Sequence, residues 1–166
     1  MKELIALPIL AFTLIVQMAI ASRIPLLSGY ADLMLIAIAA WSVQRRVETA
    51  WHWAILSGLF VGLTSALPLA VPLVGYLLMV VFARALVRRI WQAPLLALFV
   101  IVFLGAMIFH LLSFFVLRLA GNPTSLADAL SFVTLPSVLI NLFLALPAYP
   151  IFRDLSIWVY DAAEEE

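Results

Sequence analysis

Long runs of apolar residues, separated by small groups of charges, prolines and glycines, dominate this sequence. The first run, Leu4–Ser22, contains 19 residues and no charge. A bilayer core is about 30 Å thick and takes about 20 helical residues to cross. Apolar residues make up 67% of the chain and charged residues 11%, against roughly 45–50% and about 25% in soluble domains. A soluble domain of this length could not bury so many apolar side chains, so we predict an integral membrane protein.

The runs divide the chain into six apolar segments, which predict an all-α protein with six transmembrane helices. They are Leu4–Ser22, Ile24–Val43, Ala50–Leu67, Pro68–Val87, Pro94–Leu117 and Leu130–Phe152. The second is the weakest, since its uninterrupted part, Tyr30–Val43, gives only about 21 Å of helix. We expect this segment to be tilted little, to be extended by the residues before it, or to be partly sheltered by protein. Pro68 and Pro72 predict a tight hairpin between the third and fourth spans.

The charges predict the orientation of these spans, because positively charged loops stay on the cytoplasmic side. With the N-terminus inside, that side holds seven of the nine cations, namely Lys2, Arg45, Arg46, Arg84, Arg88, Arg89 and Arg153. The other side holds Arg23 and Arg118. We therefore expect both termini in the cytoplasm, a six-span domain over residues 1–153 and an acidic cytoplasmic tail over residues 154–166. Arg84, Arg88 and Arg89 form a basic cluster that either sets this topology or binds anionic lipid or a partner.

Few polar residues lie deep in the predicted spans, where ionisable groups are costly and usually functional. Gln17 lies in the first span, Asp32 near the outer end of the second, His110 in the middle of the fifth and Asn141 in the middle of the sixth. They form no paired carboxylates, histidine pair or Ser-His-acid set. The chain also has no cysteine. We predict no catalytic, cofactor or metal site, and a protein that is not an enzyme.

Each of these residues has a structural explanation that we favour over a functional one. His110 is either a proton-relay or ligand group or, as we favour, a neutral imidazole hydrogen-bonded to a neighbouring helix. Asn141 is expected to bond between helices, although a substrate contact would leave the same signal. Asp32 is more simply a carboxylate that complements a helix dipole than an external binding residue. Ser125, three residues before Asp128, predicts the cap of the sixth helix.

The third segment carries small residues at every fourth position. These are Ala54, Gly58, Gly62 and Ala66. Such a stripe lets two helix backbones approach closely in a membrane. It could face the same chain or a partner protein, and we favour the same chain.

Three stretches resemble the rod shape-determining protein MreD family: YADLMLIAIAAWSV, WAILSGLFVGLTSALPLAVPLVGYLL and LPSVLINLFLALPAYPIFRDL. Together they cover roughly residues 30–155. The positions that match the family's features are Asp32, Gly58, Pro68, Gly75, Tyr76, Asn141, Tyr149, Pro150 and Arg153. The chain departs from the family at the end of the third span, where Gly62, Thr64 and Ser65 stand in place of a frequent acidic residue.

This resemblance implies a non-enzymatic scaffold in the bacterial inner membrane, within the machinery that elongates the cell wall. It implies as partners an MreC-like bitopic protein, the RodA glycosyltransferase, a class B transpeptidase and MreB filaments, and a fold similar to the substrate-binding subunits of energy-coupling-factor transporters. The alternative is a substrate-binding subunit of a vitamin or small-molecule transporter. That function needs polar groups converging on the external half, and the sequence offers only Tyr30, Asp32, Ser113 and the loop around Asn122. Membrane lipid is a further expected contact, and zero net charge gives no sign of a nucleic-acid partner.

Overall fold

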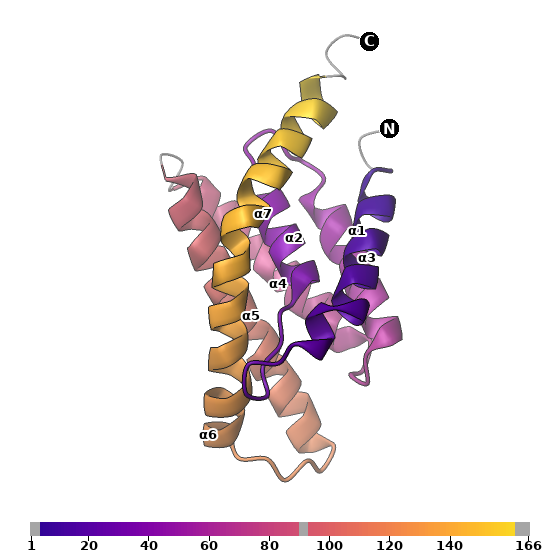
Figure 1. The fold of residues 1–166 in the computed structure, drawn as a ribbon, viewed down its shortest axis with the longest axis vertical. Coiled ribbons are helices and arrows are strands. Elements are labelled where there is room, and N and C mark those ends of the chain that lie inside the picture. Colours follow the sequence, from indigo (N-terminus) through magenta and orange to yellow (C-terminus); the bar gives the residue numbers. More distant parts are fainter. Residues whose placement is uncertain (1–3, 90–92, 162–166) are drawn as a thin grey trace.

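The structure is a computed structural model and describes residues 4–89 and 93–161. Within these ranges it is helical and contains no strand. The elements are α1 (Ala6–Ala19), the 3-10 helix η1 (Ala21–Arg23), α2 (Leu33–Ser42), α3 (Ala50–Thr64), α4 (Ala70–Val87), α5 (Pro94–Leu119), α6 (Leu126–Asp128), the π-helix η2 (Ala129–Thr134) and α7 (Leu135–Asp161). They follow the predicted apolar segments in order (Figure 1).

Four of the described helical stretches are long and apolar enough to cross a membrane. They are Ala6–Arg23, Ala70–Val87, Pro94–Leu119 and Leu126–Tyr160. Helices α2 and α3 are apolar but shorter, with 10 and 15 residues. The chain is therefore an all-helical protein with the helices of a membrane protein, as its composition predicts.

Helix α2 forms the centre of the bundle. Nine of its ten residues are buried, from Met34 to Ser42, and helices α1, α3, α4, α5 and α7 all pack against it. A helix that is apolar on every side belongs in the interior, and the small side chains of Ala37, Ala39 and Ala40 let its neighbours come close. This helix is sheltered by protein, one of the three alternatives expected for the weak second segment.

The chain reaches α2 through an extended segment, residues 28–32, rather than through a helix that starts at Ile24. Three alternate backbone N–H groups of this segment donate to the beginning of the last helix. The bonds run from Ser28 N to Phe132 O (3.0 Å), from Tyr30 N to Ser137 Oγ (3.0 Å) and from Asp32 N to Asn141 Oδ1 (2.8 Å). Ser28 belongs to a turn, and the residues after it, 29–32, add about 13 Å at about 3.3 Å per residue to the roughly 15 Å of α2.

Two residues allow this close packing of an extended backbone on a helix. A Cβ at Gly29 would lie 2.6 Å from Ser137 N and 2.7 Å from Val133 O, so no larger residue fits without displacing backbone. Pro136 has no N–H, so in an α-helical pattern the carbonyl of Phe132 would lose its partner. That carbonyl instead accepts the N–H of Ser28.

The small residues of α3 face α4 of the same chain. A Cβ at Gly58 would lie 2.6 Å from the Cα of Leu73, and one at Gly62 would lie 3.1 Å from the Cα of Leu69. Ala54 is fully buried on the same helix. The prediction that Ala66 is the fourth member of the stripe is wrong, because α3 ends at Thr64 and Ala66 is exposed in the bend that follows. The helix ends there because Ser65 is extended as the chain approaches Pro68.

The last helical stretch begins at the predicted cap, Ser125, and continues beyond the predicted apolar segment, which ends at Phe152. Ser125 Oγ accepts the N–H of Asp128 at 3.1 Å and so caps the helix. From there the chain stays helical to Asp161, well beyond Phe152, with Pro147 and Pro150 inside the helix. The predicted division between a membrane domain over residues 1–153 and a cytoplasmic tail over residues 154–166 therefore falls within a helix, and it stays a prediction.

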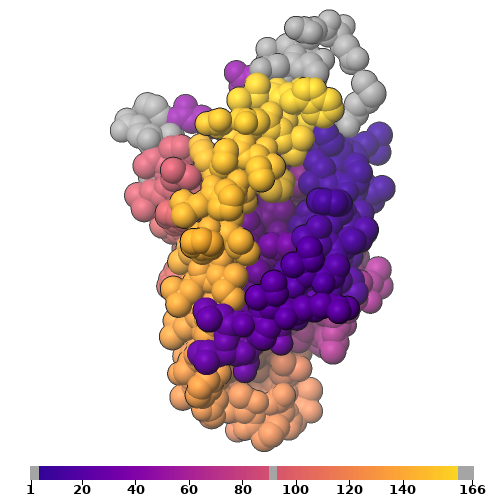
Figure 2. Space-filling model, viewed as in Figure 1, coloured from indigo at the N-terminus to yellow at the C-terminus, as the bar shows by residue number. Residues whose placement is uncertain are grey.

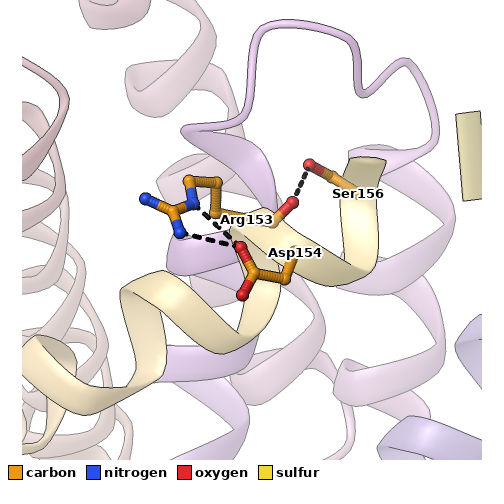
Figure 3. Close-up of polar contacts among 3 residues, drawn as sticks. All are labelled: Arg153, Asp154 and Ser156. Carbon is orange, nitrogen blue, oxygen red and sulfur yellow. Dashed lines mark hydrogen bonds and ion pairs between the residues drawn. The ribbon is translucent and has the colours of Figure 1, made fainter. Parts of the chain in front are cut away.

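Figure 3 shows the helix passing through that boundary. Arg153 Nε donates to Asp154 Oδ1 at 2.9 Å, and Ser156 Oγ donates to the carbonyl of Arg153 at 2.7 Å. Farther along, the hydroxyl of Tyr160 accepts the N–H of Glu48 at 3.0 Å. This packing on the α2–α3 loop explains why the helix continues. The acidic residues Glu164–Glu166 lie outside the described residues.

Aromatic side chains join α2, α3 and the end of α7. Trp41 stacks on Trp53 with ring centroids 4.5 Å apart, and Tyr160 lies 6.4 Å from Trp41. Trp41 Nε1 donates to Thr49 Oγ1 at 3.1 Å. The start of α1 and the C-terminal part of α7 lie at this same end of the bundle (Figure 1).

Candidate functional site

The most polar place in the interior is the N-terminus of α2. The first N–H groups of a helix have no partner within the helix, and in a bilayer core each unsatisfied group costs several kcal/mol. Here side chains supply the acceptors. Met34 N donates to Gln17 Oε1 of α1 at 3.1 Å, and Leu35 N donates to Oδ1 of Asp32, the N-cap residue, at 2.9 Å.

The carboxylate of Asp32 also receives a hydrogen bond from α4. The hydroxyl of Tyr76 lies 2.9 Å from Oδ2 and 3.1 Å from Oδ1 of Asp32. Tyr76 is fully buried, and its ring stacks on Phe109 of α5 with centroids 5.4 Å apart. The packing against α5 therefore holds the phenol in place to donate to the carboxylate.

Helix α7 completes the arrangement with Asn141 and Ser137. Asn141 is fully buried, and its Oδ1 accepts the backbone N–H of Asp32 at 2.8 Å. Its Nδ2 is buried without a partner in the described structure. We call these five side chains the polar cluster: Gln17, Asp32, Tyr76, Ser137 and Asn141.

The polar cluster binds helices together and carries no recognisable catalytic set. It connects α1, α4 and α7 to the start of α2, and its acceptors are occupied by N–H and O–H groups of the chain itself. Among residues 4–89 and 93–161, no group of three His, Cys, Asp or Glu side chains could hold a metal ion. Its chemistry is that of an internal anchor for a helix that begins inside the bundle.

The sequence analysis identified several members of the polar cluster but did not predict the contacts between them. Gln17, Asp32 and Asn141 stood out as deep polar residues, and Tyr76 entered only through the family resemblance. Ser137 was missed. Its signal is its position four residues before Asn141, which places both side chains on one face of a helix.

His110 does not have the hydrogen bond that we expected. Within the described part of the chain its ring has an edge-on contact with Phe109 but no hydrogen-bond partner. The ring lines a cavity of about 170 Å³ between α5 and η2. The expectation of a bond to a neighbouring helix is corrected, because the side chain faces a cavity there.

The basic cluster of Arg84, Arg88 and Arg89 lies where α4 ends at Val87. Arg88 and Arg89 are exposed, and Arg84 is half-buried. The described structure brings no acidic side chain into an ion pair with them. The cluster remains available for lipid headgroups or a partner, the two uses expected from the sequence beside its effect on topology.

No protein-family model, curated protein or solved structure matches this chain. The resemblance to the MreD family therefore rests on the three quoted stretches alone. Two of its positions, Asp32 and Tyr76, are in direct contact through a hydrogen bond, and Asp32 is bonded to a third, Asn141.

Proposed function

We propose that this chain is a non-enzymatic membrane scaffold of the bacterial cell-elongation machinery. The observation that carries the proposal is that the interior polar groups bind the chain's own helices, which leaves the outer apolar faces free for partners. Helix α1, for example, buries only Ala6 and Leu10. The resemblance to the MreD family names the partners: an MreC-like bitopic protein, and with it RodA, a class B transpeptidase and MreB filaments.

The proposal includes six membrane crossings in the inner membrane, with both termini in the cytoplasm. Helix α2 and the extended segment before it together cover about 28 Å, close to the roughly 30 Å of a bilayer core. The charge asymmetry of the loops supports the orientation. The likeness to the substrate-binding subunits of energy-coupling-factor transporters belongs to this proposal and concerns the fold.

We place the membrane helix of the MreC-like partner in the groove between α1 and α7. Figure 2 shows this side, with purple residues visible between the indigo and the yellow segments. The groove is lined by Phe12 and Val16 of α1, by Ile36 of α2 and by Ala148 and Ile151 of α7, among others. A partner helix there would contact the central helix directly, so assembly would depend on the shape of the core.

The second candidate, a transporter subunit, is favoured by one observation. The cavity beside His110 is lined by Ser113 and Asn122, two of the residues expected for an external pocket. Its volume of about 170 Å³ is below the roughly 300–1,000 Å³ of pockets for drug-sized ligands. Tyr30 and Asp32 belong instead to the extended segment and the polar cluster, so the scaffold is the better supported function.

Co-purification of partners tests the scaffold. A tagged chain expressed in cells lacking the native copy should retain the MreC-like protein after mild detergent extraction and restore rod shape. Ala148→Trp would fill the groove between α1 and α7, and we expect partner retention to fall at normal protein level. Phe115→Trp, on an exposed face of α5, is the matched control and should retain the partner.

Two results would contradict the proposal. Rod shape restored without any retained elongation protein would remove the scaffold function. Retention of a transporter's ATPase subunits in place of the MreC-like protein would establish the second candidate.

A further inference from the structure

The cavity beside His110 lies between the last turns of α5 and the π-helix η2. Its polar lining consists of His110, Ser113, Arg118, Asn122, Thr124 and Thr134. The polar residues of α5 recur on one face, from the middle of the helix to its last turn, so the cavity extends from the bundle interior to the end of the span. The loop after α5 closes it with Asn122 and Thr124.

The π-helix forms the opposite wall. Ala129, Val133 and Thr134 line the cavity from η2. A π-helical turn holds an extra residue, and such turns occur frequently at functional sites. The carbonyl of Phe132 in this π-helix accepts the backbone N–H of Ser28. The extended segment therefore holds this wall of the cavity in place.

Arg118 brings an uncompensated positive charge to the mouth of the cavity. Its Nη1 donates to the carbonyl of Asn122 at 3.1 Å. In the described structure Arg118 has no carboxylate partner. Asp128 of α6 instead accepts a hydrogen bond from Ser125 Oγ at 2.6 Å. A guanidinium presents several N–H donors in a planar fork that matches phosphate.

We propose that this cavity binds the phosphate-bearing headgroup of an anionic membrane lipid. A cavity of about 170 Å³ holds a small polar group and not a whole ligand of the usual drug size, roughly 300 Å³ or more. The remainder of a lipid would leave the cavity past Phe114, Leu117 and Val133, which belong to its apolar lining. The polar groups divide accordingly: Arg118 binds the phosphate, while the hydroxyl of Thr134 and the unpartnered imidazole of His110 bind oxygens of the headgroup.

This inference does not depend on the scaffold function, because it needs only a membrane around the bundle. The position of the cavity favours a lipid headgroup over free phosphate as the ligand. The cavity is at the end of the long apolar helix α5, where headgroups meet the protein, and Phe114, Leu117 and Val133 supply most of its apolar lining.

Native mass spectrometry of the detergent-purified full chain tests the proposal. The probes are phosphatidylglycerol, phosphatidylcholine and inorganic phosphate. We expect bound phosphatidylglycerol to exceed phosphatidylcholine, and Arg118→Gln to weaken phosphatidylglycerol binding at least about tenfold, as expected for lost charge-assisted hydrogen bonds. Arg23→Gln removes the other cation predicted on that side and is the matched control, expected to bind like the unaltered chain.

A second variant tests the location independently of charge. Ala129→Leu fills the cavity from η2 while leaving Arg118 in place, and we expect it to lose phosphatidylglycerol selectivity at unchanged helical content by circular dichroism. Equal losses in Arg118→Gln and Arg23→Gln, or full binding by folded Ala129→Leu, would overturn the proposal. Displacement of the lipid by inorganic phosphate at equal concentration would show a soluble anion site instead.

Discussion

Single polar side chains in this protein act on the backbone of a helix that starts inside the bundle. Asp32 accepts the N–H of Leu35, and Gln17 accepts the N–H of Met34. Each bond replaces water that the bilayer core cannot supply. The carboxylate of Asp32 is therefore needed first as an acceptor, and a neutral side chain of the same shape should serve nearly as well.

This reasoning predicts different outcomes for two substitutions at Asp32. Asp32→Ala removes the acceptor for Leu35 N–H and for the buried hydroxyl of Tyr76, and we expect the free energy of unfolding to fall by about 1–3 kcal/mol. Asp32→Asn keeps an oxygen for these donors, and the loss should be less than about 1 kcal/mol. Unfolding of the purified chain in mixed micelles, followed by circular dichroism, gives both values.

Asp154→Asn is the control, because Asp154 is exposed and bonded only to its neighbour Arg153 in the described structure. It should leave stability unchanged. If Asp32→Asn were as damaging as Asp32→Ala, the negative charge itself would be required and the polar cluster would be more than an anchor.

At the residue scale the sequence indicated which side chains matter but not where they meet. Asp32 was correctly assigned to a helix N-terminus, since that inference is local. The bonds from Asp32 to Asn141 and to Tyr76 join residues far apart in the chain. Their meeting depends on how α2, α4 and α7 pack, which no local pattern encodes. The expected bond of His110 failed for the same reason, because its partner had to come from another helix.

At the scale of elements, glycines set how closely the helices α3 and α4 approach. The two glycines of α3 face the backbone of α4. At Gly58 the nearest atom to an added Cβ is the Cα of Leu73, which cannot move alone. At Gly62 it is the end of the flexible Leu69 side chain, at 2.8 Å.

We therefore predict a graded response to enlarging these residues. Gly58→Leu should reduce stability by about 1–3 kcal/mol or more through overpacking, and Gly62→Leu should do so by a smaller amount. The fraction of monodisperse protein after detergent extraction and the unfolding midpoint measure both. Leu63→Ala, at a side chain 77% exposed on the same helix, is the control, and normal stability of both glycine variants would show that the helices can separate freely.

The limits of the helices were predictable where prolines and charges mark them and were missed where packing decides. Pro94 begins α5 as expected, and Ala50 begins α3. The second apolar segment was predicted from Ile24, with an uninterrupted part from Tyr30, whereas α2 begins at Leu33. An apolar run does not reveal that its first part is extended. The end of α7 was missed because Tyr160 packs on the α2–α3 loop, a contact between distant parts of the chain.

For the whole molecule, the number of membrane crossings depends on the two shorter apolar helices, α2 and α3. Four stretches are long enough by themselves. If α2 and α3 also cross, the chain has six crossings; if they do not, it has four. Both numbers are even, so both arrangements leave the termini on the same side of the membrane. The α2–α3 loop distinguishes these arrangements. That loop packs against the end of α7 through Glu48 and Tyr160, so its side of the membrane should match that of the C-terminal part of α7.

Single cysteines measure this directly, because the chain has none of its own. In sealed cells an impermeant thiol reagent should label Ser22→Cys and Asn122→Cys, at the end predicted to be external. It should reach Glu48→Cys and Asp154→Cys only after the membrane is opened, because both sit at the end that carries most of the cations. All four positions are exposed and none is a cation, so the substitutions leave the charge asymmetry of Lys and Arg unchanged. Labelling of Glu48→Cys in sealed cells, with Asp154→Cys protected, would mean that α2 and α3 enter and leave from the external side and that only the four long helices cross.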